Sequence, residues 1–291
     1  MGRTSPVTQE RRSVEELEDL AFELRQKLLN LCGTYEGAVH IGGDLSSADI
    51  FTALFEYGLN VDPTNLANPT RDRFVLSKGH AAVAMYIAMA IKGFFSYDGI
   101  VDTYGQLDSA YGMHPCKVQL PGVEASTGSL GHGLPLAVGM AMGARGRGAT
   151  HRVVTLMGDG ETGEGSVWEA ALVASSNKLG NLVAVIDRNR QLMTSFDEER
   201  VTLEPYTDKW AAFGWNVIHV DGHDMAALVE AIDSLPPTDS DKPTVIVAET
   251  VKGKGVDFME HNLAWHAGSL GAADLERALA ALEATRTKEN V

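Results

Sequence analysis

Apolar positions recur at helical spacing in the first half of the chain. From residue 14 to residue 32 they fall three and four residues apart, which predicts an amphipathic helix. Further helices are predicted over 48–57, 80–92 and 134–145. The segment 80–92 is almost wholly apolar, so we expect it to be buried on all sides.

A second pattern begins after residue 150, where short apolar or β-branched runs alternate with helical stretches. Strands separated by helices are typical of a mostly parallel sheet with helices on both faces. The pattern therefore predicts an α/β fold, with 1–13 as a polar, mobile N-terminus and 14–291 as a single domain. The predicted strands are 153–157, 182–186, 216–220 and 244–249, and the predicted helices are 165–178, 203–213, 224–234 and 272–287.

Composition and charge narrow the possible functions. The 24 Lys and Arg face 39 Asp and Glu, a net charge of −15, which argues against a general binder of nucleic acid or of an anionic membrane. The longest apolar run, 81–91, is too short to span a bilayer, and the first twenty residues lack the apolar core of a signal peptide. The two cysteines form no CxxC pair, so we expect a cytoplasmic protein without a disulfide framework.

A glycine-rich loop follows the predicted strand 153–157. Its residues 158–163 match GxGxxG, and Asp187 ends the next predicted strand, as in a dinucleotide-binding fingerprint. An NAD-dependent dehydrogenase is therefore one alternative. The carboxylates of Asp159, Glu161 and Glu164 argue against it, because they would repel a diphosphate unless a divalent cation lay between them.

A cation site is predicted at the same edge of the sheet. Asp159 follows one strand, and Asn189 and Gln191 follow the neighbouring one. Because the carboxyl ends of parallel strands meet at one edge, the Asp159 carboxylate, the Asn189 amide oxygen and the Gln191 main-chain carbonyl can converge on one ion. Such oxygen ligands suit Mg²⁺, or Ca²⁺ or Mn²⁺ in its place.

The sequence resembles transketolase, specifically its N-terminal diphosphate-binding half, over about residues 15–290. A GDG turn followed about thirty residues later by an Asn is the motif for thiamine diphosphate and Mg²⁺ in that family. Several further motifs occur in the family's order. They are HIGGDLS at 40–46, RDRFVLSKGH at 71–80, GMHP at 112–115, PGVEASTGSLGHG at 121–133, KGKG at 252–255 and WH at 265–266.

The resemblance implies roles for individual residues. His40 and His266 would transfer protons, His114 would hold the donor's first hydroxyl, and His80 would lie near the diphosphate and the substrate. The metal ligands would be Asp159, Asn189 and the carbonyl of Gln191. The cofactor-binding residues would be Gly128, Ser129, Leu130, Gly158, Asp159, Gly160, Glu164 and Asn189, with His132 as a weaker candidate.

The resemblance also implies a partner. In transketolases a second domain carries the glutamate that activates the cofactor, and we expect this chain to take it from a separate C-terminal-type subunit, in an α2β2 assembly. The expected reaction moves a two-carbon ketol unit from a ketose or ketose phosphate to an aldehyde. Two further alternatives are another thiamine-diphosphate carboligase or a 2-oxo-acid dehydrogenase α-type subunit, and a non-catalytic binding protein.

Overall fold

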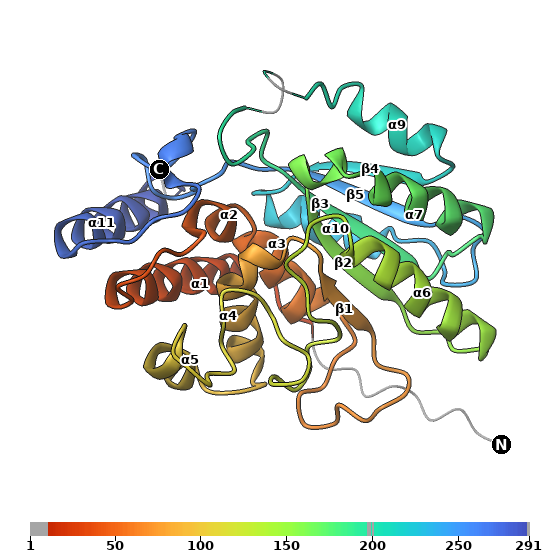
Figure 1. Ribbon diagram of the computed structural model, residues 1–291, viewed down its shortest axis with the longest axis horizontal. Helices are drawn as coiled ribbons and strands as arrows, with labels where there is room; N and C mark the ends of the chain where they lie inside the picture. The colour runs from red at the N-terminus through yellow and green to blue at the C-terminus, as the bar shows by residue number, and fades with distance from the viewer. Residues whose placement is uncertain (1–10, 197–198, 200, 290–291) are drawn as a thin grey trace.

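The chain folds around one five-stranded parallel sheet, as seen in a computed structural model (Figure 1). The structure describes residues 11–196, 199 and 201–289. The strands run in the order β1-β2-β3-β5-β4. Their bounds are β1 (Arg73–Leu76), β2 (Val153–Gly158), β3 (Leu182–Arg188), β4 (Asn216–Asp221) and β5 (Thr244–Glu249).

Helices cover both faces of the sheet (Figure 1). Alternate strand residues point to opposite sides, so Val154 and Leu156 pack on one face while Val153 and Met157 pack on the other. The first face is covered by α1 (Val14–Thr34), α3 (Ala48–Thr52), α4 (Ala82–Lys92) and α10 (Met225–Asp233), and the second by α6 (Gly133–Gly146), α7 (Gly165–Ser176) and α9 (Tyr206–Ala212). Both faces of the central strands are therefore buried, which explains their continuous apolar sequences.

The remaining elements are short helices and turns, apart from one long helix near the C-terminus. They are α2 (Ile41–Ser46), the π-helix η1 (Ala53–Gly58), α5 (Tyr97–Thr103), α11 (Ala272–Glu289) and the 3-10 turns η2 (Gly79–Ala81), η3 (Gly160–Gly163) and η4 (Leu263–Trp265). The helix α11 packs against α1, although the two are far apart in the sequence (Figure 1).

The predicted α/β class and the four predicted strands are confirmed. Strand β1 and the helices α2 and α5 were not predicted. Strand β1 is only four residues long and begins with an arginine, and Gly42 and Gly43 interrupt the helical pattern of α2. The predicted mobile N-terminus falls largely on residues 1–10, which lie outside the described residues, while Arg11 and Arg12 pair with Asp233 and Glu56.

The parallel register brings the carboxyl ends of the central strands together. Gly158 of β2 lies beside Asp187 of β3, and Asp187 lies beside Ala248 of β5. The loops that follow these strands therefore leave the sheet at one edge, where ligands bind in open α/β sheets. None of the described helices is long and apolar enough to cross a membrane.

Candidate active site

Four predicted histidines from distant parts of the chain meet in space. The ring of His40 lies 5.3 Å from His80, 5.5 Å from His266 and 6.4 Å from His114, measured between centroids. His80 and His266 are 5.9 Å apart. Three of these side chains are half-buried and His114 is exposed. The rings therefore form one cluster, which we call the histidine cluster.

Main-chain contacts hold the cluster together. Val39 and Gly268 exchange two hydrogen bonds of 2.8 and 2.9 Å, which places the segments that carry His40 and His266 side by side. Gly42 is required at a second contact, because a Cβ atom there would lie 2.5 Å from the carbonyl oxygen of Trp265. This close approach of the two backbones explains the glycine in the HIGGDLS motif.

The environment keeps the four rings neutral. Burial is the largest cause of a lowered pKa for each of them. Lys78 lowers the pKa of His80 further, and Lys252 lowers that of His266, which falls to about 3. A neutral imidazole has one N–H donor and one acceptor nitrogen, so each ring can donate one hydrogen bond and accept another at neutral pH.

The GDG turn places a buried carboxylate at the end of β2. Asp159 is 1% exposed, and its oxygens accept hydrogen bonds from the backbone N–H groups of Gly160 (2.8 Å) and Arg190 (2.7 Å). Burial, followed by the negative charge of Asp187, raises the pKa of Asp159 to about 7. A bound cation would offset both effects.

The other predicted metal ligands lie in the turn after β3. Asn189 Oδ1 accepts a hydrogen bond of 3.2 Å from the N–H of Gln191, and the contact from Arg190 brings Asp159 to the same turn. A carboxylate, an amide oxygen and a carbonyl are the hard donors that Mg²⁺ prefers, so the residues present fit this ion. No group of three or more His, Cys, Asp or Glu that could hold a metal was found among the residues described, so any metal site here depends on the amide and carbonyl oxygens.

Two buried lysines lie at the same edge of the sheet. Lys78 Nζ donates to a carboxylate oxygen of Asp187 and, at 2.8 Å, to Ser47 Oγ. Lys252 Nζ lies 2.9 Å from the carbonyl oxygen of Gln191 and 3.1 Å from Nδ1 of His266. Lys252 therefore links the predicted metal site with the histidine cluster.

Glu161 fastens the glycine loop to the strand ends. Its carboxylate is 3% exposed and accepts hydrogen bonds from Ser77 Oγ, from the N–H of Gly131 at 2.9 Å and from the N–H of Gly158 at 3.2 Å. The loop containing Gly128, Ser129 and Leu130 is thereby held beside β1 and β2.

The remaining predicted cofactor residues surround this loop. A Cβ atom at Gly128 would lie 3.1 Å from the His114 ring, and one at Gly160 would lie 2.4 Å from a methyl group of Leu192. Glu164 is exposed at the N-cap of α7. His132 is exposed at the N-cap of α6, with Nδ1 3.0 Å from Leu130 O.

Asp187 argues against the dinucleotide interpretation. In that interpretation its carboxylate would bind a ribose hydroxyl. Instead it is fully buried and accepts hydrogen bonds from protein donors on both oxygens. These donors are Ser46, Ser47, Lys78, Asn189 and Thr250.

Comparisons with known proteins agree with this geometry. The family model described as "Transketolase, thiamine diphosphate binding domain" matches residues 34–288. The chain belongs to the transketolase family. It is a transferase subunit of the kind that binds thiamine diphosphate with a divalent metal.

Transketolases that resemble this chain are of two lengths. One subunit of the apulose-4-phosphate transketolase of Phocaeicola vulgatus is 42% identical over 91% of this chain and 93% of its own length. The 6-deoxy-6-sulfo-D-fructose transketolase subunit SqwG of a Clostridium species is 37% identical over 92% and 96%. The transketolase of Campylobacter jejuni superposes with a TM-score of 0.83 and 29% identity, over 93% of this chain but only 42% of its own. This transketolase chain thus has the length of the relatives that are named as subunits.

Three site residues, Lys78, Lys252 and Glu161, were not identified as such from the sequence. Both lysines stand in the quoted motifs RDRFVLSKGH and KGKG, so the motifs contained a signal for them. Glu161 was noted only as a carboxylate in the loop. Its hydrogen bonds from Ser77 and Gly131 follow from the tertiary arrangement, which neither motif nor spacing reveals.

Proposed function

We propose that this chain is the N-terminal subunit of a two-chain transketolase and that the histidine cluster is the catalytic part of its active site. The reaction is the transfer of a two-carbon ketol unit from a ketose or ketose phosphate to an aldehyde. The observation that carries the proposal is the convergence of four neutral histidines beside the GDG edge of the sheet.

The cluster suits the handling of several substrate hydroxyls. His40 and His266 lie 5.5 Å apart and nearly perpendicular, so one substrate can contact both rings. In the proposal they move protons at the hydroxyl beside the bond that breaks and at the reacting oxygen. Exposed His114 holds the donor's first hydroxyl, and His80, beside Lys78, faces the diphosphate and the substrate.

The strand ends hold the cofactor in this proposal. Asp159, Asn189 and the Gln191 carbonyl hold Mg²⁺, and Gly158, Gly160 and Glu164 shape the diphosphate site from the GDG side. From the other side the site is lined by Gly128, Ser129, Leu130 and, at its rim, His132. Bound thiamine diphosphate supplies a nucleophilic thiazolium carbon and an electron sink for C–C bond cleavage.

The partner in the proposal is a separate C-terminal transketolase-type subunit. The length match with relatives named as transketolase subunits supports this. The partner contributes the glutamate that activates the cofactor, in an α2β2 assembly. Free thiols at Cys32 and Cys116 agree with a cytoplasmic location.

The proposed substrates are small sugars or sugar phosphates. Relatives named for apulose-4-phosphate and for 6-deoxy-6-sulfo-D-fructose support a ketose donor bearing an anionic group.

Calorimetry on the chain co-purified with a C-terminal transketolase-type subunit tests the proposal. We expect thiamine diphosphate to bind only when Mg²⁺ is present and NAD not to bind. Binding of NAD, or binding of thiamine diphosphate that is indifferent to Mg²⁺, would contradict it. The mass of the purified complex tests the α2β2 stoichiometry.

A further inference from the structure

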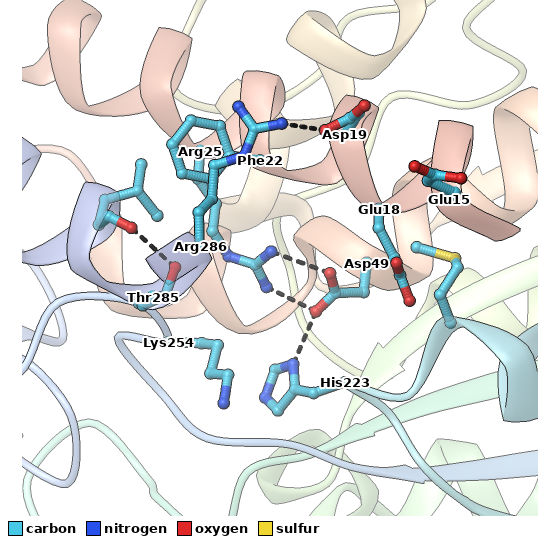
Figure 2. Close-up of a pocket in the computed structure, with 13 residues that line it drawn as sticks. Glu15, Glu18, Asp19, Phe22, Arg25, Asp49, His223, Lys254, Thr285 and Arg286 are labelled. Atoms are coloured by element: carbon cyan, nitrogen blue, oxygen red, sulfur yellow. Dashed lines mark hydrogen bonds and ion pairs between the residues drawn. The ribbon is translucent and has the colours of Figure 1, made fainter. Parts of the chain in front are cut away.

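His223, in the turn after β4, has both ring nitrogens engaged in a nearly buried position, and Figure 2 shows its contact with Asp49. Nδ1 lies 2.7 Å from Oδ2 of Asp49, and the main-chain N–H of Val251 donates to Nε2 at 2.8 Å. Because a main-chain N–H can only donate, Nε2 must carry the lone pair. The ring proton is therefore on Nδ1 and is donated to Asp49.

Asp49 is itself held in place by a second partner. Arg25 of α1 makes a two-point contact with the Asp49 carboxylate of α3, at 2.9 and 2.5 Å (Figure 2). The two side chains are only 8% and 10% exposed. Burial alone would raise the pKa of Asp49, but Arg25, together with His223, holds it well below its usual range. A paired, ionised carboxylate therefore orients the imidazole.

This group lines a hollow of about 610 Å³ between α1 and α11, apart from the histidine cluster. None of the four clustered histidines lines that hollow. The main chain after β5 connects this hollow with the histidine cluster. Val251, which donates to His223, is followed directly by Lys252, whose ammonium contacts Gln191 O and His266 Nδ1.

A second contact limits the movement of the same segment. The N–H of Gly253 donates to the carbonyl of Gly42 at 3.0 Å, just beyond His40. Lys252 thus lies between two main-chain N–H groups that are held by hydrogen bonds. That of Val251 is held by His223, and that of Gly253 by the carbonyl of Gly42. Of these, only the first depends on a side chain that can be replaced without touching the histidine cluster.

We infer that His223 is a positioning residue of the active site. Backed by Arg25 and Asp49, it holds the main chain at Val251 and so directs the Lys252 ammonium to Gln191 and His266. The inference rests on the proposed function for the ligand that this site receives. The contact between His223 and Val251 itself does not.

Amide hydrogen exchange followed by NMR tests, without any ligand, whether His223 holds the main chain at Val251. In the full chain, His223→Ala should speed exchange at the Val251 amide by at least about tenfold, because its acceptor is lost. The β3 amides of Val183 and Val185 should keep their protection, which shows that the fold persists. His223→Gln, which carries both a donor and an acceptor, should restore much of the protection, and the matched control His219→Ala on β4 should change nothing. Unchanged exchange at Val251 in His223→Ala would overturn the inference.

The second part of the inference, that His223 directs Lys252 to the active site, is tested with thiamine diphosphate and Mg²⁺ as the probe. Binding of this probe is measured by calorimetry on the chain with its partner subunit. His223→Ala should weaken binding about tenfold, and Lys252→Met should weaken it at least as much. Because His223 acts through Lys252, the double variant should bind no more weakly than Lys252→Met alone. Additive losses, or faster exchange with unchanged affinity, would overturn the inference. Failure of the unsubstituted complex to bind the probe would instead overturn the proposed function, and the exchange experiment would still decide whether His223 fixes Val251.

Discussion

Nζ of Lys252 lies 3.1 Å from Nδ1 of His266. Burial is the largest cause of the low pKa of His266, about 3, and the positive charge of Lys252 is the next. The lysine therefore acts on the histidine through charge as well as through a hydrogen bond. Two consequences can be measured on the chain without a substrate.

Replacing Lys252 with Met should raise the pKa of His266 towards the ordinary histidine value. The apolar chain keeps most of the volume and removes only the cation. Titration of the His266 ring by NMR measures the change, with Lys254→Met, two residues along the same loop, as the control. An unchanged pKa in Lys252→Met would show that the ammonium does not act on this ring.

Acid should destabilise the folded protein through the histidine cluster. A histidine in the unfolded chain titrates near about pH 6.5. The folded rings have lowered pKa values, about 3 for His266, so below about pH 6.5 the unfolded chain binds more protons and the stability falls as the pH falls. Above about pH 6.5 the histidine cluster does not make the stability depend on pH.

The melting temperature, followed from about pH 8 to about pH 5, checks this expectation. The drop on acidification should be smaller in His266→Gln, which cannot take up the proton, than in the unsubstituted chain. His219→Gln, half-exposed on β4, should keep the full drop. Equal drops in all three proteins would refute a contribution from the cluster.

Much of the fold could be predicted because its central strands are buried on both faces. Continuous apolar runs such as 182–186 are visible in the sequence for that reason. The strand order could not be predicted, since β5 inserts between β3 and β4 through tertiary packing alone. Strand β1 has four residues and too little pattern to stand out.

The candidate site likewise contains residues that the sequence predicted and residues that it did not. Motif order predicted the four histidines, and the structure brings them together. No motif of the sequence includes His223, and nothing in its local sequence points to Asp49, 174 residues away. Glu161 likewise binds Ser77 and Gly131, which lie apart from it in the sequence. Such long-range contacts carry no signal in spacing or periodicity.

Glu161→Gln should loosen the glycine loop. The amide replaces one accepting oxygen with a donor, so at least one of the Ser77, Gly131 and Gly158 donors loses its partner in a buried site. We expect a loss of about 1–3 kcal/mol in the free energy of unfolding. Urea unfolding measures it, and Glu169→Gln, exposed on α7, should lie within about 0.5 kcal/mol of the unsubstituted protein. A Glu161→Gln variant as stable as this control would exclude the fastening role.

Asp159→Ala should remove Mg²⁺-dependent binding of thiamine diphosphate, with affinity falling by roughly 100-fold or more. The only carboxylate among the proposed metal ligands is lost, while the surrounding turn remains. Calorimetry on the complex measures the change, and Asp208→Ala on the exposed side of α9 is the control. Retained affinity in Asp159→Ala would place the metal elsewhere.

The two-chain claim is tested most directly by transketolase activity after reconstitution. Ketol transfer from a ketose phosphate to an aldehyde should be measured with Mg²⁺ and thiamine diphosphate for this chain, for a C-terminal transketolase-type chain, and for their mixture. We expect turnover only in the mixture, and its loss when His266→Ala replaces the unsubstituted chain. Full turnover by this chain alone, or none by the mixture with any ketose phosphate tested, would contradict it.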